Sequence, residues 1–208
     1  MKKTDRTRTI LALLDEHYGT DIKCFLHHEN AWQLLVATIL SAQCTDDRVN
    51  LVTRELFAKY DSVVTLAGAD VAELEDIIRS TGFFRNKAKN IIACCQRIRD
   101  VHGGEVPRTV EELTALSGVG RKTANVVRGN VFGEPSIVVD THVMRVSKRL
   151  GVTEESDPVK IEFDLMKVLP EEHWIRYNMQ VISFGRAICK APKPKCGECF
   201  LREYCSGG

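Results

Sequence analysis

Apolar residues recur every three or four positions along most of the chain, which is the spacing of an amphipathic helix. Near the N-terminus one such stripe runs from Ile10 through Leu14 to Tyr18, and Gly19 ends it. The strict alternation of apolar and polar residues that marks a half-buried strand is almost absent. The pattern therefore predicts an all-α protein.

Capping residues set the expected helix boundaries. Polar N-cap side chains accept hydrogen bonds from the first free amides, and a Glu three positions later completes a capping box. Asn30 is the expected cap of a helix over 31–43, and Asp70 with Glu73 is the expected box of a helix that ends near Gly82. Further helices are expected over 49–60, 86–101, 109–116, 121–132 and 140–150, with Pro158 and Pro170 at the first positions of two more.

The size and hydrophobicity of the chain indicate an ordinary globular protein. Its 208 residues, 44% of them hydrophobic, can form one large or two small domains. The longest apolar run, 31–42, is interrupted by polar residues and is short of the roughly 20 residues that span a bilayer. The basic start leads into an apolar stretch too short for a signal peptide. We therefore expect a cytoplasmic protein that binds no membrane.

Charged residues are unevenly distributed, although the net charge is only +1. Residues 117–150 hold six Lys or Arg against two acidic residues, and residues 185–205 hold five against two. One basic face on a nearly neutral protein fits this distribution and is typical of nucleic-acid binding. Scattered solvated charges are the commoner explanation of any single cluster.

Four cysteines lie close together near the C-terminus. Cys189, Cys196, Cys199 and Cys205 form the pattern C-x6-C-x2-C-x5-C. Disulfides are rare in cytosolic proteins, so these thiols are expected to bind a metal or an iron–sulfur cluster. Zinc sites of four cysteines usually combine two C-x2-C pairs, and only one is present here. The spacing alone does not distinguish a zinc ion from an iron–sulfur cluster.

The segment LSGVGRKTANVV, residues 116–127, is a second candidate site. Gly118 and Gly120 let the backbone approach a ligand closely, and amides at the start of the following helix suit a phosphate oxygen. Lys122 lies in the first helical turn, where the positive end of the helix dipole disfavours an ammonium. A tight turn without a ligand would explain an isolated G-x-G. The basic residues that flank this G-x-G and the cysteine loop favour a ligand here.

Together these segments resemble the endonuclease III family of DNA glycosylases. LSGVGRKTANVV is similar to the family's helix–hairpin–helix, VDTHVMR (139–145) to its catalytic segment, LSAQCTD (40–46) to its N-terminal motif, and the cysteine spacing to its [4Fe–4S] loop. The resemblance spans essentially the whole chain. It implies two helical domains, a six-helix barrel over 24–135 and a cluster domain made of 1–23 and 136–208, with double-stranded DNA across the groove between them. We expect the protein to be a monomer.

The resemblance also implies an activity, the removal of oxidised pyrimidines from duplex DNA followed by cleavage at the abasic site. Lys122 matches the lysine that attacks C1′ of a flipped nucleotide, expels the base and forms a Schiff base. The attacking amine must be neutral, a form that the helix terminus and partial burial are expected to favour. Asp140 matches the carboxylate that stabilises positive charge on the sugar and shuttles protons.

Further side chains are expected at the DNA. Gln43 matches the glutamine that fills the gap left by the flipped base, and Phe83 is a candidate wedge from the opposite side, with core packing as its alternative. His142 matches the family's histidine and is expected to contact either the substrate or its own fold. The other expected DNA contacts are Gly118, Gly120, Arg121, Lys190, Lys193 and Lys195, and the implied cluster ligands are the four C-terminal cysteines.

Some residues depart from the family pattern. Ser117 stands where the hairpin often carries proline, and Arg128 and Gly129 lie in the second hairpin helix, whose stability they put in question. A monofunctional mismatch adenine glycosylase is an alternative, but that branch lacks the lysine and carries a further C-terminal domain, whereas this sequence ends three residues after Cys205. A non-catalytic iron–sulfur DNA-binding protein is the other alternative, which Lys122 and Asp140 together oppose.

Overall fold

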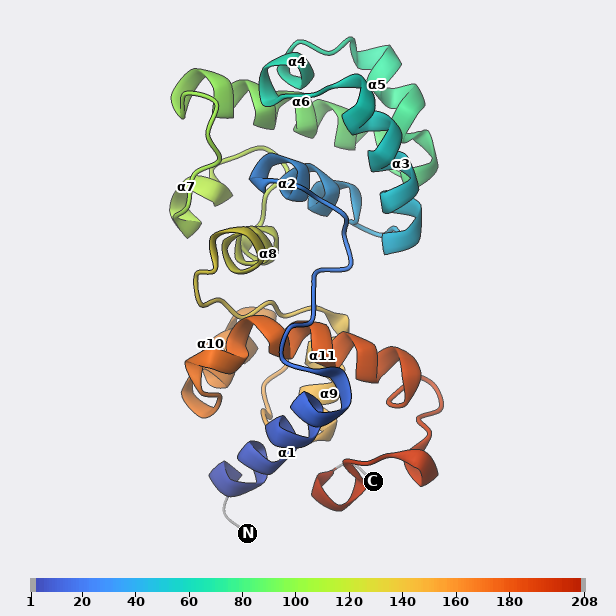
Figure 1. The fold of residues 1–208 in the computed structure, drawn as a ribbon, viewed down its shortest axis with the longest axis vertical. Coiled ribbons are helices and arrows are strands. Elements are labelled where there is room, and N and C mark those ends of the chain that lie inside the picture. Colours follow the sequence, from blue (N-terminus) through green and yellow to red (C-terminus); the bar gives the residue numbers. More distant parts are fainter. Residues whose placement is uncertain (1–2, 207–208) are drawn as a thin grey trace. The chain divides into compact units, whose positions relative to one another are not determined.

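The computed structural model describes residues 3–206, and none of these residues lies in a β-strand. The all-α prediction is therefore confirmed. The chain divides into two compact units, one formed by residues 24–134 and the other by both ends of the chain (Figure 1). Within the described part of the chain, no helix is both long enough and apolar enough to cross a membrane.

Helix α2 lies at the centre of the unit 24–134. Eight of its ten residues, from Gln33 to Leu40, are buried, as expected for a helix that is apolar on every face. Helices α3, α6 and α8 pack on it, while α4 and α5 pack on α6. The elements of this unit are α2 (Ala31–Leu40), α3 (Asp46–Lys59), α4 (Val63–Ala67), α5 (Val71–Ile78), the 3-10 helix η1 (Arg79–Thr81), α6 (Phe84–Val101), α7 (Val110–Thr114) and α8 (Arg121–Phe132).

The ends of α2 are set by local hydrogen bonds. Asn30 caps its start as predicted, because the side chain accepts a bond from the amide of Gln33 at 3.1 Å. The helix ends at Leu40, three residues before the predicted end at 43. The Ser41 hydroxyl donates to the carbonyl of Thr38 at 2.8 Å, which satisfies one of the last carbonyls and lets the chain turn.

The capping box predicted for α5 forms only in part. Asp70 accepts a bond from the amide of Glu73 at 3.0 Å. The Glu73 carboxylate, however, does not return to Asp70. It accepts a bond from the Tyr60 hydroxyl at 2.8 Å and forms an ion pair with Lys59. The ammonium of Lys59 is a charged donor, which binds a carboxylate more strongly than a backbone amide does. The Glu73 side chain therefore turns to the end of α3.

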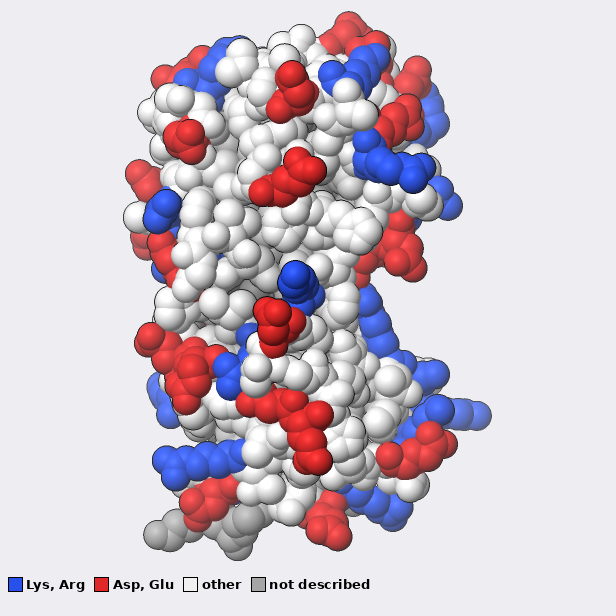
Figure 2. Space-filling view, viewed as in Figure 1, with Lys and Arg blue, Asp and Glu red and all other residues white. Residues whose placement is uncertain are grey.

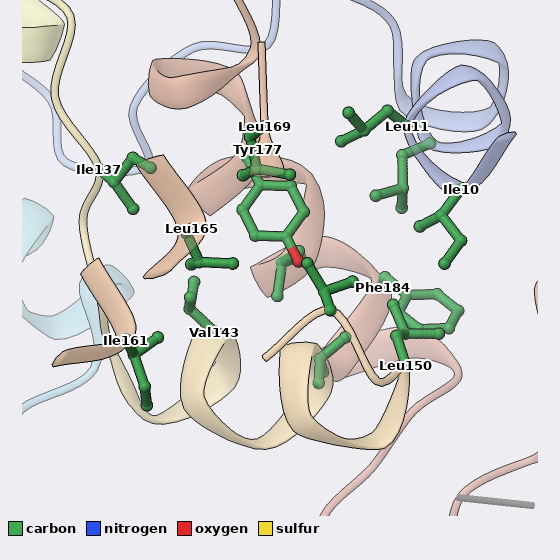
Figure 3. Close-up of a cluster of buried hydrophobic side chains, with 14 of the residues drawn as sticks. Ile10, Leu11, Ile137, Val143, Leu150, Ile161, Leu165, Leu169, Tyr177 and Phe184 are labelled. Carbon is green, nitrogen blue, oxygen red and sulfur yellow. The ribbon is translucent and has the colours of Figure 1, made fainter. Parts of the chain in front are cut away.

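Both ends of the chain share the hydrophobic core of the second unit. Figure 3 shows Ile10 of α1, Val143 of α9 and Leu165 of α10 grouped with the fully buried Tyr177 of α11. Burial raises the pKa of Tyr177 to about 12, and its hydroxyl pairs with Ser147 at 2.9 Å. The elements of this unit are α1 (Lys3–Tyr18), α9 (Thr141–Arg149), α10 (Pro158–Val168), η2 (Glu171–His173), α11 (Trp174–Ala187), η3 (Cys196–Glu198) and η4 (Arg202–Tyr204).

Only one of the two predicted proline starts is confirmed. Pro158 opens α10 behind Asp157, whose carboxylate accepts bonds from the next two free amides at 3.0 Å. Pro170 does not open a long helix. It precedes the short η2, and α11 begins at Trp174, whose indole donates to the carbonyl of Leu169 at 3.0 Å. The indole bond thus fixes the start of α11 after the proline.

Asp15 joins α1 to α11. Its carboxylate accepts bonds from Arg176 at 2.9 and 3.1 Å and from Gln180 at 2.8 Å. Burial by itself would raise the pKa of Asp15, but the bonds from Arg176 and Gln180, with the charge of Arg176, outweigh burial and lower it. The ionised carboxylate therefore stabilises the packing of the N-terminal helix.

We predict that Asp15→Asn lowers the free energy of unfolding by about 2 kcal/mol at neutral pH, the size of a hydrogen bond to a charged group. A lowered pKa means that this stability is present above the unfolded-state pKa and is lost as the pH falls through the folded-state pKa. The difference from the unchanged protein should therefore shrink below about pH 4. Denaturant titrations at several pH values measure it. The exposed neighbour Glu16 supplies the control Glu16→Gln, and equal effects of the two changes would contradict the prediction.

Candidate functional site

The hairpin between α7 and α8 requires glycine at position 118. Gly118 has φ of 76°, in the left-handed region that favours glycine. A Cβ built there would lie 2.9 Å from the Cβ of Asn90 in α6, closer than two such atoms can approach. The conformation and the packing of the hairpin against α6 thus both exclude a side chain.

Gly120 differs from Gly118 because the fold itself does not require it. Its φ is −95°, which any residue adopts. Among the described residues other than its chain neighbours, none has an atom within 4 Å of a Cβ built there. It is the N-cap of α8 and offers no capping side chain. The space beside it is open to an approaching ligand.

Lys122 lies in the first turn of α8, and its side chain is exposed. The partial burial expected for it is therefore wrong for the protein without DNA. Its neighbour Arg121, the first residue of the helix, is half-buried. The helix thus places an accessible primary amine directly after the hairpin glycines.

The departures at Arg128 and Gly129 do not interrupt α8. The helix is continuous from Arg121 to Phe132, with Gly129 buried inside it. The Arg128 guanidinium forms an ion pair with Glu134 at 2.9 Å and donates to the carbonyl of Arg108 at 3.1 Å. Arg128 therefore fastens the end of α8 to the segment before α7.

Asp140 and His142 lie at the start of α9, in the unit formed by the chain ends. Asp140 is half-buried and caps the helix by accepting a bond from the amide of Val143 at 2.8 Å. The Nδ1 atom of His142 is 3.2 Å from the Arg145 guanidinium, and the ring lies directly against Gly185 of α11. His142 thus has contacts within its own fold that orient it.

Gln43 and Phe83 lie in two turns of the unit 24–134, after α2 and before α6. Both side chains are exposed, with 64% of Phe83 accessible to solvent. Core packing, the alternative considered for Phe83, is therefore wrong. An exposed phenylalanine side chain is available to a partner.

The four C-terminal cysteines line one cavity of about 140 Å³ and form no disulfide. Burial raises the pKa of the Cys199 thiol, and the three other sulfur atoms add to this effect, which indicates that they are close to it. The Arg149 guanidinium donates to the Cys189 sulfur at 3.4 Å, and the Cys205 thiol donates to the carbonyl of Arg149 at 3.2 Å. These contacts give the loop a defined shape around the cavity.

The lining of the cavity can be compared with the needs of the two groups considered for it, a zinc ion and an iron–sulfur cluster. Zinc requires four ligand atoms at about 2.0–2.3 Å from one centre. Among residues 3–206 no three Cys, His, Asp or Glu side chains converge on a position for one metal ion. The four thiols that line the cavity match in number the thiolates that an iron–sulfur cluster takes, one on each iron.

The three lysines of the cysteine loop are exposed, but they are not equivalent. Lys195 forms an ion pair with Glu198 at 3.3 Å. Within residues 3–206, no ion pair is described for Lys190 or Lys193. On the face of the molecule shown in Figure 2, acidic and basic side chains are interspersed.

Two arginines of α9 support the cysteine loop in ways that the sequence analysis did not identify. Arg149 donates to the carbonyls of Lys190 and Ala191 at 2.8 and 2.9 Å. Arg145, one helical turn earlier, donates to the carbonyl of Cys189 at 3.2 Å. Their spacing of four residues on the helix that Asp140 begins was the available signal.

The helical fold and the glycine hairpin define a class of DNA repair proteins. The family profile described as "HhH-GPD superfamily base excision DNA repair protein" matches residues 36–171. This span contains the hairpin, Lys122 and Asp140. It excludes the cysteine loop.

Relatives similar over nearly the whole chain narrow this class. Endonuclease III of a Synechocystis strain is 51% identical over 98% of this chain and 93% of its own length, and that of Bacillus subtilis is 49% identical over 89% and 85%. The solved structure of a non-covalent endonuclease III–DNA complex is 45% identical, covers 100% of this chain and 97% of its own, and has a TM-score of 0.93. The chain belongs to the endonuclease III family.

We predict different costs for alanine at the two hairpin glycines. Gly118→Ala should lower the free energy of unfolding by about 3 kcal/mol, because it adds left-handed strain to a clash with Asn90. Gly120→Ala should cost only about 1 kcal/mol, the difference between glycine and alanine at an N-cap. Urea unfolding of both variants measures these values. Equal losses would mean that the hairpin does not pack on α6 as described.

Proposed function

We propose that this protein is a base-excision-repair DNA glycosylase with abasic-site lyase activity, which removes oxidised pyrimidines from double-stranded DNA. The observation that carries the proposal is the exposed amine of Lys122 in the first turn of α8, directly after the glycine hairpin. A protein 45% identical to this chain, with a TM-score of 0.93, is the subject of the "Structure of a Trapped Endonuclease III-DNA Covalent Intermediate: Estranged-Adenine Complex".

Lys122 is the proposed nucleophile. Its neutral amine attacks C1′ of the flipped nucleotide, the bond from C1′ to the base breaks, and the base leaves with the bonding electrons and a proton. Opening of the sugar ring then gives a Schiff base between Nζ and C1′. Loss of a proton from C2′ expels the phosphate on C3′, which cuts the strand by β-elimination. An amine that is exposed before DNA binds is accessible to C1′.

Asp140 is the proposed electrostatic partner of this reaction. Positive charge develops on the sugar as the base departs, and a fixed carboxylate stabilises that charge. The bond from the Val143 amide to Oδ1 holds the Asp140 side chain at the start of α9. His142, oriented by Arg145 and Gly185, is the proposed support beside it.

Separate parts of the chain are the proposed contacts with DNA. Open space beside Gly120 leaves room for a phosphate oxygen at the positive end of α8. Gln43 and Phe83, both exposed, are the proposed residues that fill the gap left by the flipped nucleotide. Further phosphate contacts are proposed for Gly118, Arg121, Lys190, Lys193 and Lys195.

The four cysteines that line the cavity, Cys189, Cys196, Cys199 and Cys205, are the proposed ligands of a [4Fe–4S] cluster. The group would link four points of a loop that has only short 3-10 helices of its own. Arg145 and Arg149 hold the same loop by its carbonyls.

We propose that the protein acts as a monomer on the DNA of the cytoplasm. Lys122 argues against both a monofunctional glycosylase and a non-catalytic binding protein.

We predict that borohydride added during turnover reduces the Schiff base and links the protein covalently to lesion-containing DNA. Lys122→Gln should abolish this adduct and lower strand cleavage by at least about three orders of magnitude, because no other group replaces the nucleophile. DNA affinity should be largely retained, since the hairpin contacts are made by backbone. Gel electrophoresis of the adduct and a binding titration measure the two effects.

The control for this experiment is Lys89→Gln, which removes an exposed lysine of α6. It should be trapped as efficiently as the unchanged protein. Persistent trapping of Lys122→Gln would assign the chemistry to another amine. Absence of any adduct with the unchanged protein, on a panel of oxidised pyrimidines and abasic sites, would contradict the proposed function itself.

We predict that the anaerobically purified protein is yellow-brown, contains about four iron atoms per chain and absorbs light at about 400 nm. Cys199→Ser should lose most of the iron, because it removes one ligand, whereas Cys24→Ser should keep it, because Cys24 lies in the other unit. Metal analysis and the absorption spectrum measure this outcome. Colourless protein with one zinc per chain would refute the cluster assignment.

A further inference from the structure

Two turns of the unit 24–134 share a rare backbone conformation. Gln43 and Phe83 have φ values of 54° and 49°, and no other non-glycine residue between 3 and 206 has a positive φ. This conformation costs a non-glycine residue of the order of 1–3 kcal/mol, and such residues collect at functional positions. Both side chains are exposed, so no burial of side-chain area compensates for the strain of the two backbone conformations.

Lys87 of α6 connects these two turns. Its Nζ donates to the carbonyl of Leu40 at 2.7 Å and to the carbonyl of Thr81 at 2.8 Å. Leu40 lies three residues before Gln43, and Thr81 lies two residues before Phe83. One side chain thus binds the segment that precedes each turn. In the sequence, Lys87 is 47 residues from Leu40 and 6 residues from Thr81.

Both acceptors suit an ammonium group. Leu40 is the last residue of α2 and Thr81 the last of η1, so each carbonyl lies at a helical C-terminus, where carbonyls lack helical partners and the dipole is negative. Only 5% of Lys87 is exposed. Burial lowers the pKa of Lys87, while the nearby Cys44 opposes this effect. A buried ammonium that left these oxygens would lose its compensation for desolvation, so its position is tightly restricted.

We propose that Lys87 is a positioning residue that fixes the spacing of the Gln43 and Phe83 turns, so that their side chains enter a damaged duplex as a pair. The inference rests on the proposed function and goes beyond it, because Lys87 is buried and has no part in the proposed reaction. A preset spacing spares the two turns from being ordered when DNA binds. It also means that the two side chains fill one gap together.

The test compares one lesion in two contexts, within a paired duplex and within an unpaired bulge. Only the paired context requires the gap to be opened and filled. Lys87→Met removes the donors while nearly keeping the length of the side chain. It should lower kcat/KM on the paired lesion by about tenfold to a hundredfold, the effect of a displacement of about 1 Å. On the unpaired lesion the loss should stay within about threefold.

The matched control is Lys89→Met, a lysine of the same helix whose side chain is exposed. It should leave both rates unchanged. A lysine with only a structural role would reduce stability and lower both rates by the same factor in Lys87→Met. Equal losses on paired and unpaired lesions would therefore overturn the inference.

Combined substitutions test the pairing without relying on Lys87→Met to fold. In the unchanged background, the losses caused by Gln43→Ala and Phe83→Ala on the paired lesion should be non-additive, because each side chain needs the other. Adding Lys87→Met to the variant that carries both alanine changes should not alter the ratio of kcat/KM between the paired and the unpaired lesion any further. If Lys87→Met does not fold, the cycle of the two alanine variants decides, and additive losses overturn the inference.

Failure of this inference is distinguishable from failure of the proposed function. Processing of the unpaired lesion by the unchanged protein, with covalent trapping, tests the chemistry of Lys122 alone. If that reaction is present and the two contexts respond equally to Lys87→Met, only the positioning role is refuted. If that reaction is absent, the proposed glycosylase and lyase activity is refuted, and with it the basis of the positioning role.

Discussion

The burial of α2 is the constraint on which the unit 24–134 depends. The last carbonyls of a buried helix need hydrogen-bond donors, and in α2, which packs against α3, α6 and α8, the chain itself supplies them. Ser41 supplies a hydroxyl and Lys87 an ammonium. Because the ammonium also binds the carbonyl of Thr81, the donor that completes α2 fixes the turn before α6 as well. A requirement of the core thereby determines the geometry of two surface turns.

Helix α9 has a comparable place in the other unit. Its first turn is capped by Asp140, and its later turns direct Arg145 and Arg149 to the carbonyls of the cysteine loop. Since an α-helix is stiff, the carboxylate and the loop are held at a fixed separation. The proposed reaction chemistry and the proposed cluster therefore share one rigid support.

The sequence predicted the helices well where the signals are local, and less well where distant residues compete. Asn30 and Asp157 cap their helices as predicted, because a cap involves only the next few amides. The Glu73 carboxylate is instead taken by Lys59 and Tyr60, and the start of α11 moves beyond Pro170. Neither competing contact can be identified from a short window of sequence.

The candidate site shows the same limit. Motif resemblance assigned expected roles to Lys122 and Asp140, yet the sequence could not establish that Lys122 is exposed or that Phe83 lies outside the core. Lys87 did leave a signal, a lysine within the apolar stripe of α6 that includes Ile91. Its partners could not be predicted, because two carbonyls far apart in sequence meet at its amine only after the unit has folded.

The two hairpin glycines separate what folding requires from what a ligand requires. At Gly118 the left-handed backbone and Asn90 exclude any side chain, so folding alone accounts for the glycine. At Gly120 neither constraint applies, and a polar N-cap would stabilise α8 better than a glycine does. A glycine kept where the fold favours another residue leaves the start of α8 open. The proposed function uses that opening for the close approach of a phosphate to the helix terminus, beside the amine of Lys122.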